Sequence, residues 1–474
     1  MIERMQQNFQ IVLRRFPAAP LLLGLTVVAL LAGVAIAEER WPYLLMLALI
    51  PLLWFFPIET TVGLFALSIP FEGVSELSSG TTAIWILGLL AGGTLVTVGL
   101  LNNRFVKPPR NAIFWTLFLF WCGMSLLWAV DPKSALRQLA TSAALIIFYL
   151  VAISFRITES EFKWVVRLAI LGGCLAATFA VYEYSAGINW ATGSGSSLVE
   201  RGSLIVGETE VNPDFFGLKL IIPISLTMAA FLSARSWWGR LISFCALAIT
   251  VLALLLTMSR SALLALLVIV IVFLVRLRVY RRLIPVVLLG SILLAAMPSS
   301  FYGRIQEAGQ TGGAGRLDIW KVGFEMFKHY PLVGTGLGNF MIVYQQYAGF
   351  SPKFHGFMRS PHNTYLNVLV DLGILGFVLF LIAIVMQVRD GSDSKMRSQD
   401  SKVWVVAGEA AFYGLLLYGF FVDVMWDKSF WLAGIFLAFA IMVQRPQTTE
   451  PLEHGIGSGK RTGRVKEDGR RGFE

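Results

Sequence analysis

Apolar residues form long, nearly uninterrupted runs along the chain, and these runs determine its predicted fold class. A run of about 17–25 apolar residues is long enough to cross roughly 30 Å of hydrocarbon as a helix. Such runs recur throughout, and they predict an all-α polytopic membrane protein with about 12–14 transmembrane helices. We expect spans at 17–37, 41–56, 58–74, 82–101, 111–130, 135–155, 163–185, 213–233, 240–258, 260–277, 281–299, 363–388, 404–424 and 428–443.

Polar sequence is concentrated in three stretches, and these divide the chain. Residues 1–299 form a predicted N-terminal transmembrane bundle, which contains a Gly/Ser-rich loop at 186–212. A large, partly helical loop at 300–362 separates this bundle from C-terminal transmembrane helices at 363–443. The tail 444–474 is rich in glycine and charge and has almost no apolar content, so we expect it to be disordered.

The positions of lysine and arginine predict the orientation in the membrane. Basic residues of short loops remain in the cytoplasm, which places both termini there and both polar loops on the opposite side. The first apolar run ends in Ala35-Ile36-Ala37 and resembles a signal peptide, although the many later spans favour an uncleaved signal-anchor. The basic clusters that carry this inference are Arg14/Arg15, Arg104/Lys107/Arg110, Arg235/Arg240, Arg276/Arg278/Arg281/Arg282 and Lys395/Arg397/Lys402.

Composition agrees with the apolar pattern and narrows the classes of partner. Of the 474 residues, 56% are hydrophobic and 14% charged, which excludes an ordinary soluble domain. The net charge of +10 is explained by the basic loops and the tail, so no nucleic-acid partner is expected. Cys122, Cys174 and Cys245 lie inside predicted spans without disulfide or zinc spacing, and we expect no metal site.

The stretch SPHNTYLNVLVDLGILG, residues 360–376, is a candidate site at the start of a span. Ser360 is a suitable N-cap and Pro361 a suitable first residue, which would place His362 in the first helical turn. The positive end of the helix dipole disfavours imidazolium, so His362 would be neutral and able to accept a proton from a hydroxyl. A simple capping cluster explains the stretch equally well. The polar stripe continues at intervals of four residues through Asn363, Asn367 and Asp371.

Arg316 opens a second candidate element, GRLDIWKVGFEMFKHYP at residues 315–331. The pattern predicts a helix up to Pro331, with acidic and basic residues on one arc and aromatic residues on the other. Arg316 falls with the aromatic residues, where a charge requires a partner or a ligand. Alternatively, Arg316 precedes the first full turn and reaches water. The charged arc is Asp318, Lys321, Glu325 and Lys328; the other contains Trp320, Gly323, Phe324 and Phe327.

Arg260 lies in a third element, TMSRSALLALL at residues 257–267, between two apolar runs. The predicted topology places it on the same side as His362, where the positive-inside bias makes a lone arginine unexpected. Its planar donor fork suits a phosphate group. The alternative is an arginine whose side chain extends to the membrane interface.

Two further stretches give weaker signals. PLVGTGLGNF, residues 331–340, predicts a glycine-rich turn between helices, in which Gly336 and Gly338 would allow close backbone approach to a phosphate. ERGSLIVGETEVNPDFFG, residues 200–217, contains Arg201, Asn212 and Asp214 before a span, and a solvated loop is its default interpretation. Together, the five stretches suggest group transfer from a phospholipid-like donor on the non-cytoplasmic face.

These elements resemble those of the O-antigen ligase and Wzy-type polymerase superfamily. The resemblance rests on SRSALLALL (259–267), GRLDIWKVGFEMF (315–327), HYPLVGTGLGNF (329–340) and PHNTYLNVLVDLGILG (361–376) in this order, and it covers about the C-terminal half. It implies a GT-C-like glycosyltransferase of the bacterial inner membrane, which takes a glycan from undecaprenyl pyrophosphate on the periplasmic face. Neither a metal nor another cofactor is implied.

The resemblance also implies roles for individual residues. His362 would act as the base or orient the acceptor, and Arg260 and Arg316 would hold the pyrophosphate. Arg201 is a weaker correspondence, since Asp214 stands in NPDFFG where asparagine is common. The expected substrate-binding residues are Arg201, Asn212, Gly336, Gly338 and Asn363.

The motifs leave the exact reaction open. A ligase transfers finished polysaccharide to lipid A-core, whereas a polymerase transfers the chain to a second lipid-linked repeat unit; the ligase is favoured by a small margin. A transporter or flippase for the same lipid-linked glycan is an alternative of another class. It would be expected to show repeat symmetry and paired ionisable residues near mid-membrane, whereas the polar clusters here are mainly at one surface.

Overall fold

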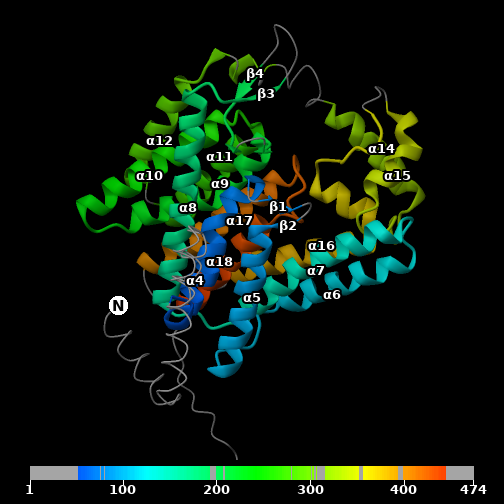
Figure 1. Ribbon diagram of the computed structural model, residues 1–474, viewed down its shortest axis with the longest axis horizontal. Coiled ribbons are helices and arrows are strands. Elements are labelled where there is room, and N and C mark those ends of the chain that lie inside the picture. Colours follow the sequence, from blue (N-terminus) through cyan, green and yellow to red (C-terminus); the bar gives the residue numbers. More distant parts are fainter. Residues whose placement is uncertain are drawn as a thin grey trace, which may run out of the picture.

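Helices dominate the computed structural model, which is drawn in Figure 1. It describes residues 52–74, 76–78, 81–192, 199–206, 209–278, 280–299, 301–303, 306, 315–351, 356–392 and 399–444. The larger helices are α4 (Pro57–Ser68), α5 (Ala83–Leu101), α6 (Asn111–Met124), α7 (Pro132–Ile153), α8 (Glu159–Ser185), α9 (Pro213–Ser233), α10 (Trp237–Leu256), α11 (Arg260–Leu277), α12 (Tyr280–Ala295), α14 (Arg316–His329), α15 (Phe340–Tyr347), α16 (Thr364–Ser392), α17 (Gln399–Tyr418) and α18 (Lys428–Gln444).

Seven helices of the described residues are long and apolar enough to cross a membrane: α5, α7, α8, α9, α10, α11 and the first 27 residues of α16. Residues 111–127 and 428–443 form shorter apolar helices. The predicted all-α polytopic membrane class is therefore confirmed. The predicted spans 58–74, 281–299 and 404–424 contain the shorter helices α4 and α12 and the C-terminal part of α17, while 17–37 and most of 41–56 lie outside the described residues.

Helix starts follow local capping chemistry. The carboxylate of Asp131 accepts hydrogen bonds from the backbone N–H groups of Lys133 and Ser134, with Pro132 at the first position of α7. Thr158 and Glu161 form a reciprocal capping box at the start of α8. These contacts satisfy N–H groups that have no partner within the helix.

Helix α9 is the most deeply buried of the candidate spans. It packs against α10, α17 and α8, and α17 in turn packs against α11 and α18. Every residue from Phe216 to Ala229 is buried, which requires a helix that is apolar on all sides. The sequence of this stretch is apolar except for Lys219, Pro223, Ser225 and Thr227. The start of α9 is thereby fixed within the bundle.

Helix α16 is kinked at Gly373, whose φ of 66° is the left-handed conformation that favours glycine. The turn at 331–338 docks against this kink. The N–H of Ile374 donates to the carbonyl of Pro331 at 2.9 Å, and the N–H of Thr335 donates to the carbonyl of Val370 at 3.0 Å. A side chain at position 373 would collide with the carbonyl oxygen of Leu332, because a Cβ there would lie 2.3 Å from it.

The polar loop 300–362 contains α14 and α15, which pack together and onto the first half of α16 through a small core of their own. In Figure 1 this pair stands at one end of the molecule, beyond α16 and α7. The predicted helix at 315–331 is present. Its predicted arcs are partly wrong, since Phe324 is exposed while Ile319, Val322 and Met326 are buried.

Short strands, which the apolar pattern did not predict, form three two-stranded antiparallel sheets. They pair β1 (Glu76–Ser78) with β2 (Thr81–Thr82), β3 (Trp190–Thr192) with β4 (Val199–Arg201), and β5 (Ile205–Val206) with β6 (Thr209–Glu210). Four of these strands belong to the loop 186–212. The N–H of Gly202 donates to the carbonyl of Leu256 at 2.8 Å, which ties this loop to the end of α10.

Candidate functional site

The ends of several elements converge on one group of charged residues. Arg201 ends β4, Asp214 is the second residue of α9, Arg260 is the first residue of α11, and Arg316 is the first residue of α14. We call these four residues the arginine cluster. His362, two residues before α16, lies within electrostatic range of Arg316 and Asp214. The structure thus brings together four of the residues singled out from the sequence, His362, Arg260, Arg316 and Arg201, although they span about 160 positions.

Arg201 is the most firmly held member of the cluster. Its Nη2 donates to Oδ1 of Asp214 at 2.8 Å, and its Nε donates to the carbonyl of Thr257 at 2.8 Å. Arg201 is only 4% exposed. A charge-assisted pair in this geometry fixes both partners, so Arg201 and Asp214 connect β4, α9 and the turn before α11. The default interpretation of residues 200–217 as a solvated loop is therefore wrong.

Hydroxyl groups complete the buried side of the cluster. Tyr418 donates its O–H to the backbone carbonyl of Asp214 at 2.6 Å. The Oγ of Ser259 lies 3.3 Å from this phenol oxygen and 3.0 Å from the Oγ of Ser261. Tyr418, Ser259 and Ser261 are buried, so they order the site without offering a surface to solvent. Tyr418 had no sequence signal, because a tyrosine at the end of an apolar run is ordinary.

Arg316 and Arg260 are held much more loosely than Arg201. Nη2 of Arg316 is 3.9 Å from Oδ2 of Asp214, which is beyond hydrogen-bond distance. The side chain of Arg260 makes no hydrogen bond or ion pair with any described residue. Burial and the nearby charge of Arg260 lower the pKa of Arg316, whereas Asp214 opposes this change. Two guanidinium groups therefore have unused donors, which is the arrangement that binds an anion.

His362 is partly exposed, and its ring makes no hydrogen bond within the described part of the chain. Partial burial lowers the pKa of His362 below its ordinary 6.5, and the positive charge of Arg316 lowers it further, against the influence of Asp214. The imidazole is therefore neutral at pH 7. A neutral ring with an unused nitrogen can accept a proton from a hydroxyl group.

The predicted start of α16 was wrong by three residues. The helix begins at Thr364, and Asn363 is the cap, because its Oδ1 accepts from the N–H groups of Tyr365 and Leu366 at 3.0 and 3.1 Å. Ser360 instead accepts from the N–H of His362 at 3.3 Å. His362 has a φ of 46°, so it belongs to the turn before the helix. Neutrality at His362 comes from burial and Arg316 rather than from a position inside the first turn.

Two of the expected substrate-binding residues act as helix caps. Asn363 uses its side-chain oxygen at the start of α16, as described above. The Oδ1 of Asn212 accepts from the N–H of Asp214 at 2.9 Å, which caps α9 and orients the carboxylate-bearing residue. Both asparagines therefore position the cluster through the backbone.

The glycine turn encloses a buried carboxyl group. Gly338 donates its N–H to Oδ2 of Asp371 at 2.7 Å, and Gly336 donates its N–H to the carbonyl oxygen of Asp371 at 2.9 Å. A Cβ at Gly336 would lie 2.5 Å from Cα of Ala129, so this face of the turn is filled by protein. The expectation that Gly336 and Gly338 approach a phosphate is corrected, because their amides are occupied by Asp371.

Asp423, between α17 and α18, is a half-buried residue that sequence reasoning missed. Its carboxylate accepts from the side chains of Asn367 and Thr364, near the start of α16. The three members of the predicted stripe at 363, 367 and 371 thus contact three different partners and form no common surface.

A second charged group lies deeper along α9. Lys219 pairs with Glu72 and Asp427, and Lys428 pairs with Glu72. We call these four residues the charge tetrad. Burial alone would raise the pKa of Glu72, but the two lysines lower it to about 2. The tetrad contains two positive and two negative charges, so it links α9, the 3-10 turn after α4 and the start of α18 without surplus charge.

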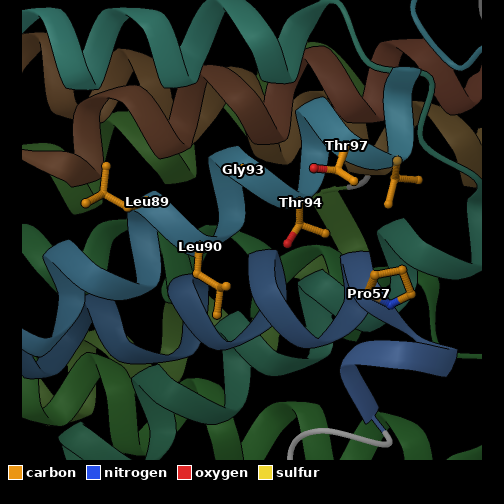
Figure 2. A pocket seen from close by; sticks show the side chains of 7 residues that line it. Pro57, Leu89, Leu90, Gly93, Thr94 and Thr97 are labelled. Atoms are coloured by element: carbon orange, nitrogen blue, oxygen red, sulfur yellow. The ribbon is translucent and has the colours of Figure 1, made fainter. Parts of the chain in front are cut away.

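An open groove between α4 and α5 differs from the two charged clusters because it has no charged lining residue. It encloses about 400 Å³, and Figure 2 shows Thr94 and Thr97 of α5 beside Leu89, Leu90 and Pro57. None of its lining residues is titratable, so it has no group for acid–base catalysis or for neutralising a phosphate. The lining residues are Pro57, Leu89, Leu90, Gly93, Thr94, Thr97 and Val98.

Comparisons with known proteins find similarity over a range that includes much of this site. Residues 245–381 match the family model described as "O-Antigen ligase", and this range contains Arg260, Arg316 and His362. A protein of Rickettsia prowazekii (strain Madrid E) named "Putative polysaccharide ligase RP358" is 25% identical over an alignment of 347 residues, and the match covers 68% of this chain and 77% of that protein. The resemblance to the O-antigen ligase and Wzy-type superfamily is thereby confirmed.

Proposed function

We propose that the protein is a membrane glycosyltransferase that moves a glycan from undecaprenyl pyrophosphate to an acceptor hydroxyl, with O-antigen ligation to lipid A-core as its reaction. The observation that carries the proposal is an imidazole within electrostatic range of Arg316, in a cluster of three arginines of which two have unused donors. The family match and the name of the Rickettsia protein support a polysaccharide substrate. The site would face the periplasm from the inner membrane, with both termini in the cytoplasm.

In the proposed reaction, His362 accepts the proton of the acceptor hydroxyl as its oxygen attacks the anomeric carbon of the donor glycan. The new glycosidic bond forms while the bond from that carbon to the pyrophosphate oxygen breaks. The departing oxygen keeps the electron pair, and the growing negative charge is stabilised by the guanidinium groups of Arg260 and Arg316, whose donors are unused. Arg201, held by Asp214 and Thr257, adds a fixed positive charge to this field.

These residues are far apart in sequence, but packed helices and strands hold the backbone at each of them in place. Each charged residue stands at the end of a packed helix or strand, and the caps fix the backbone at α9 and α16. Charged groups that are already in position need little reorganisation when the leaving group develops its negative charge. A site of this kind catalyses transfer by differential stabilisation of the transition state.

A deletion strain tests the proposal and separates ligase from polymerase. In a host that makes O-antigen, loss of a ligase leaves all lipopolysaccharide uncapped and polymeric glycan on the carrier lipid. Loss of a polymerase leaves core bearing one repeat unit. Unchanged lipopolysaccharide on a gel would reject both activities, and return of the native pattern with a plasmid copy is the control.

A further inference from the structure

Asp214 is unexpected in a site that has to bind an anion. Its carboxylate lies between Arg201 and Arg316 and is 24% exposed, so part of it faces solvent beside the loosely held Arg316. A carboxylate repels a phosphate group and weakens its binding. A residue needed only to hold Arg201 could accept the same hydrogen bond through a neutral amide oxygen.

The charges of the cluster explain what the carboxylate contributes. Three guanidinium groups and one carboxylate leave a surplus of two positive charges. Under the proposed function, the donor is a pyrophosphate diester with two negative charges, which this surplus matches. The departing pyrophosphate monoester gains part of a third negative charge, because the last ionisation of a phosphate monoester has a pKa of about 6.

We infer that Asp214 is a charge-setting residue, which matches the site to the donor and favours release of the more negative carrier pyrophosphate. Without Asp214, three positive charges would bind both the donor and the more negative product more tightly, and slower release of the product would slow turnover. This inference rests on the proposed function. It predicts that loss of the carboxylate tightens anion binding, whereas a merely structural residue would weaken binding when replaced.

The test uses the full-length protein in nanodiscs, with inorganic pyrophosphate as the probe and calorimetry at low salt as the measurement. We expect Asp214→Asn to bind pyrophosphate about ten-fold more tightly than the native protein, with the difference shrinking as salt is added. Asparagine keeps an acceptor for Arg201, so the geometry is preserved. In glycan-transfer assays, steady-state turnover should fall more than the rate of the first turnover.

Asp214→Glu separates charge from shape. Glutamate keeps the negative charge and changes the length of the side chain, so its affinity for pyrophosphate should stay below that of Asp214→Asn. Equal or weaker binding by Asp214→Asn, with the native protein binding the probe, would overturn the inference alone. Absence of pyrophosphate binding by the native protein would overturn the proposed anion site as well. If Asp214→Asn does not fold, tighter binding by Asp214→Glu than by the native protein would also overturn the inference.

Discussion

Two clusters of charged residues lie along the same helix, α9, and they differ in net charge. The charge tetrad around Lys219 has equal numbers of positive and negative charges, and Lys219 and Asp427 are no more than 9% exposed. The arginine cluster at the start of α9 has a surplus of positive charge and two loosely held arginines. Burial requires that charges be paired, so a balanced group indicates structure, whereas an accessible surplus indicates a ligand.

The His362→Ala variant should show the largest effect on activity. Loss of the proton acceptor is expected to lower glycan transfer by about 10²–10⁴-fold without unfolding the protein, because the ring makes no hydrogen bond that supports the fold. Transfer in membrane fractions and thermal unfolding of purified protein measure the two quantities. The matched control is His329→Ala on α14, whose ring packs on Tyr347 away from the cluster, and its activity should stay near native.

Replacing Lys219 should affect stability instead. Lys219→Met removes the lysine that pairs with both Asp427 and Glu72, so we expect a loss of about 3–5 kcal/mol in unfolding free energy. The control is Lys163→Met, which removes an exposed pair with Glu159 that is worth about 0–1 kcal/mol. Thermal unfolding in detergent compares them. Equal stability of the two variants would contradict the structural role of the tetrad.

Arg316→Lys tests whether the cluster needs a planar donor fork. A lysine keeps the charge but offers a point charge in place of two parallel donors, so we expect transfer to fall about ten-fold. Arg389→Lys, at the opposite end of α16, is the comparison and should be neutral. Full activity of Arg316→Lys would indicate that only the net charge of the cluster matters.

The smallest effect concerns pH. Because the pKa of His362 is lowered, transfer should fall only as the pH drops below about 6.5, when imidazolium forms. Arg316→Gln removes a positive charge that lowers this pKa, so the acid limb of the residual activity should move to higher pH. Burial remains, and the movement should be partial. An unmoved limb would assign the loss of activity at low pH to another titratable group.

Local patterns predicted the helices and the identity of several clustered residues. Apolar runs at 213–233 and 260–277 coincide with α9 and α11, since a helix in hydrocarbon must satisfy its own backbone. Arg260 and Arg316 were noted because each charge interrupted a pattern that predicted apolar residues. The cap at Asn363 was misassigned because Ser360 and Asn363 are both good N-caps, and only the packed structure selects between them.

Sequence alone therefore determined the membrane class, most helix positions and the kinds of side chain available for chemistry, because these depend on neighbours within a few turns. Tertiary structure decided which charges meet. The pairing of Arg201 with Asp214, the contact of Gly338 with Asp371 and the tetrad around Lys219 join residues from 13 to more than 350 positions apart. Such contacts depend on how the helices pack against each other. The order of charged residues along the chain does not show which of them will be close in space.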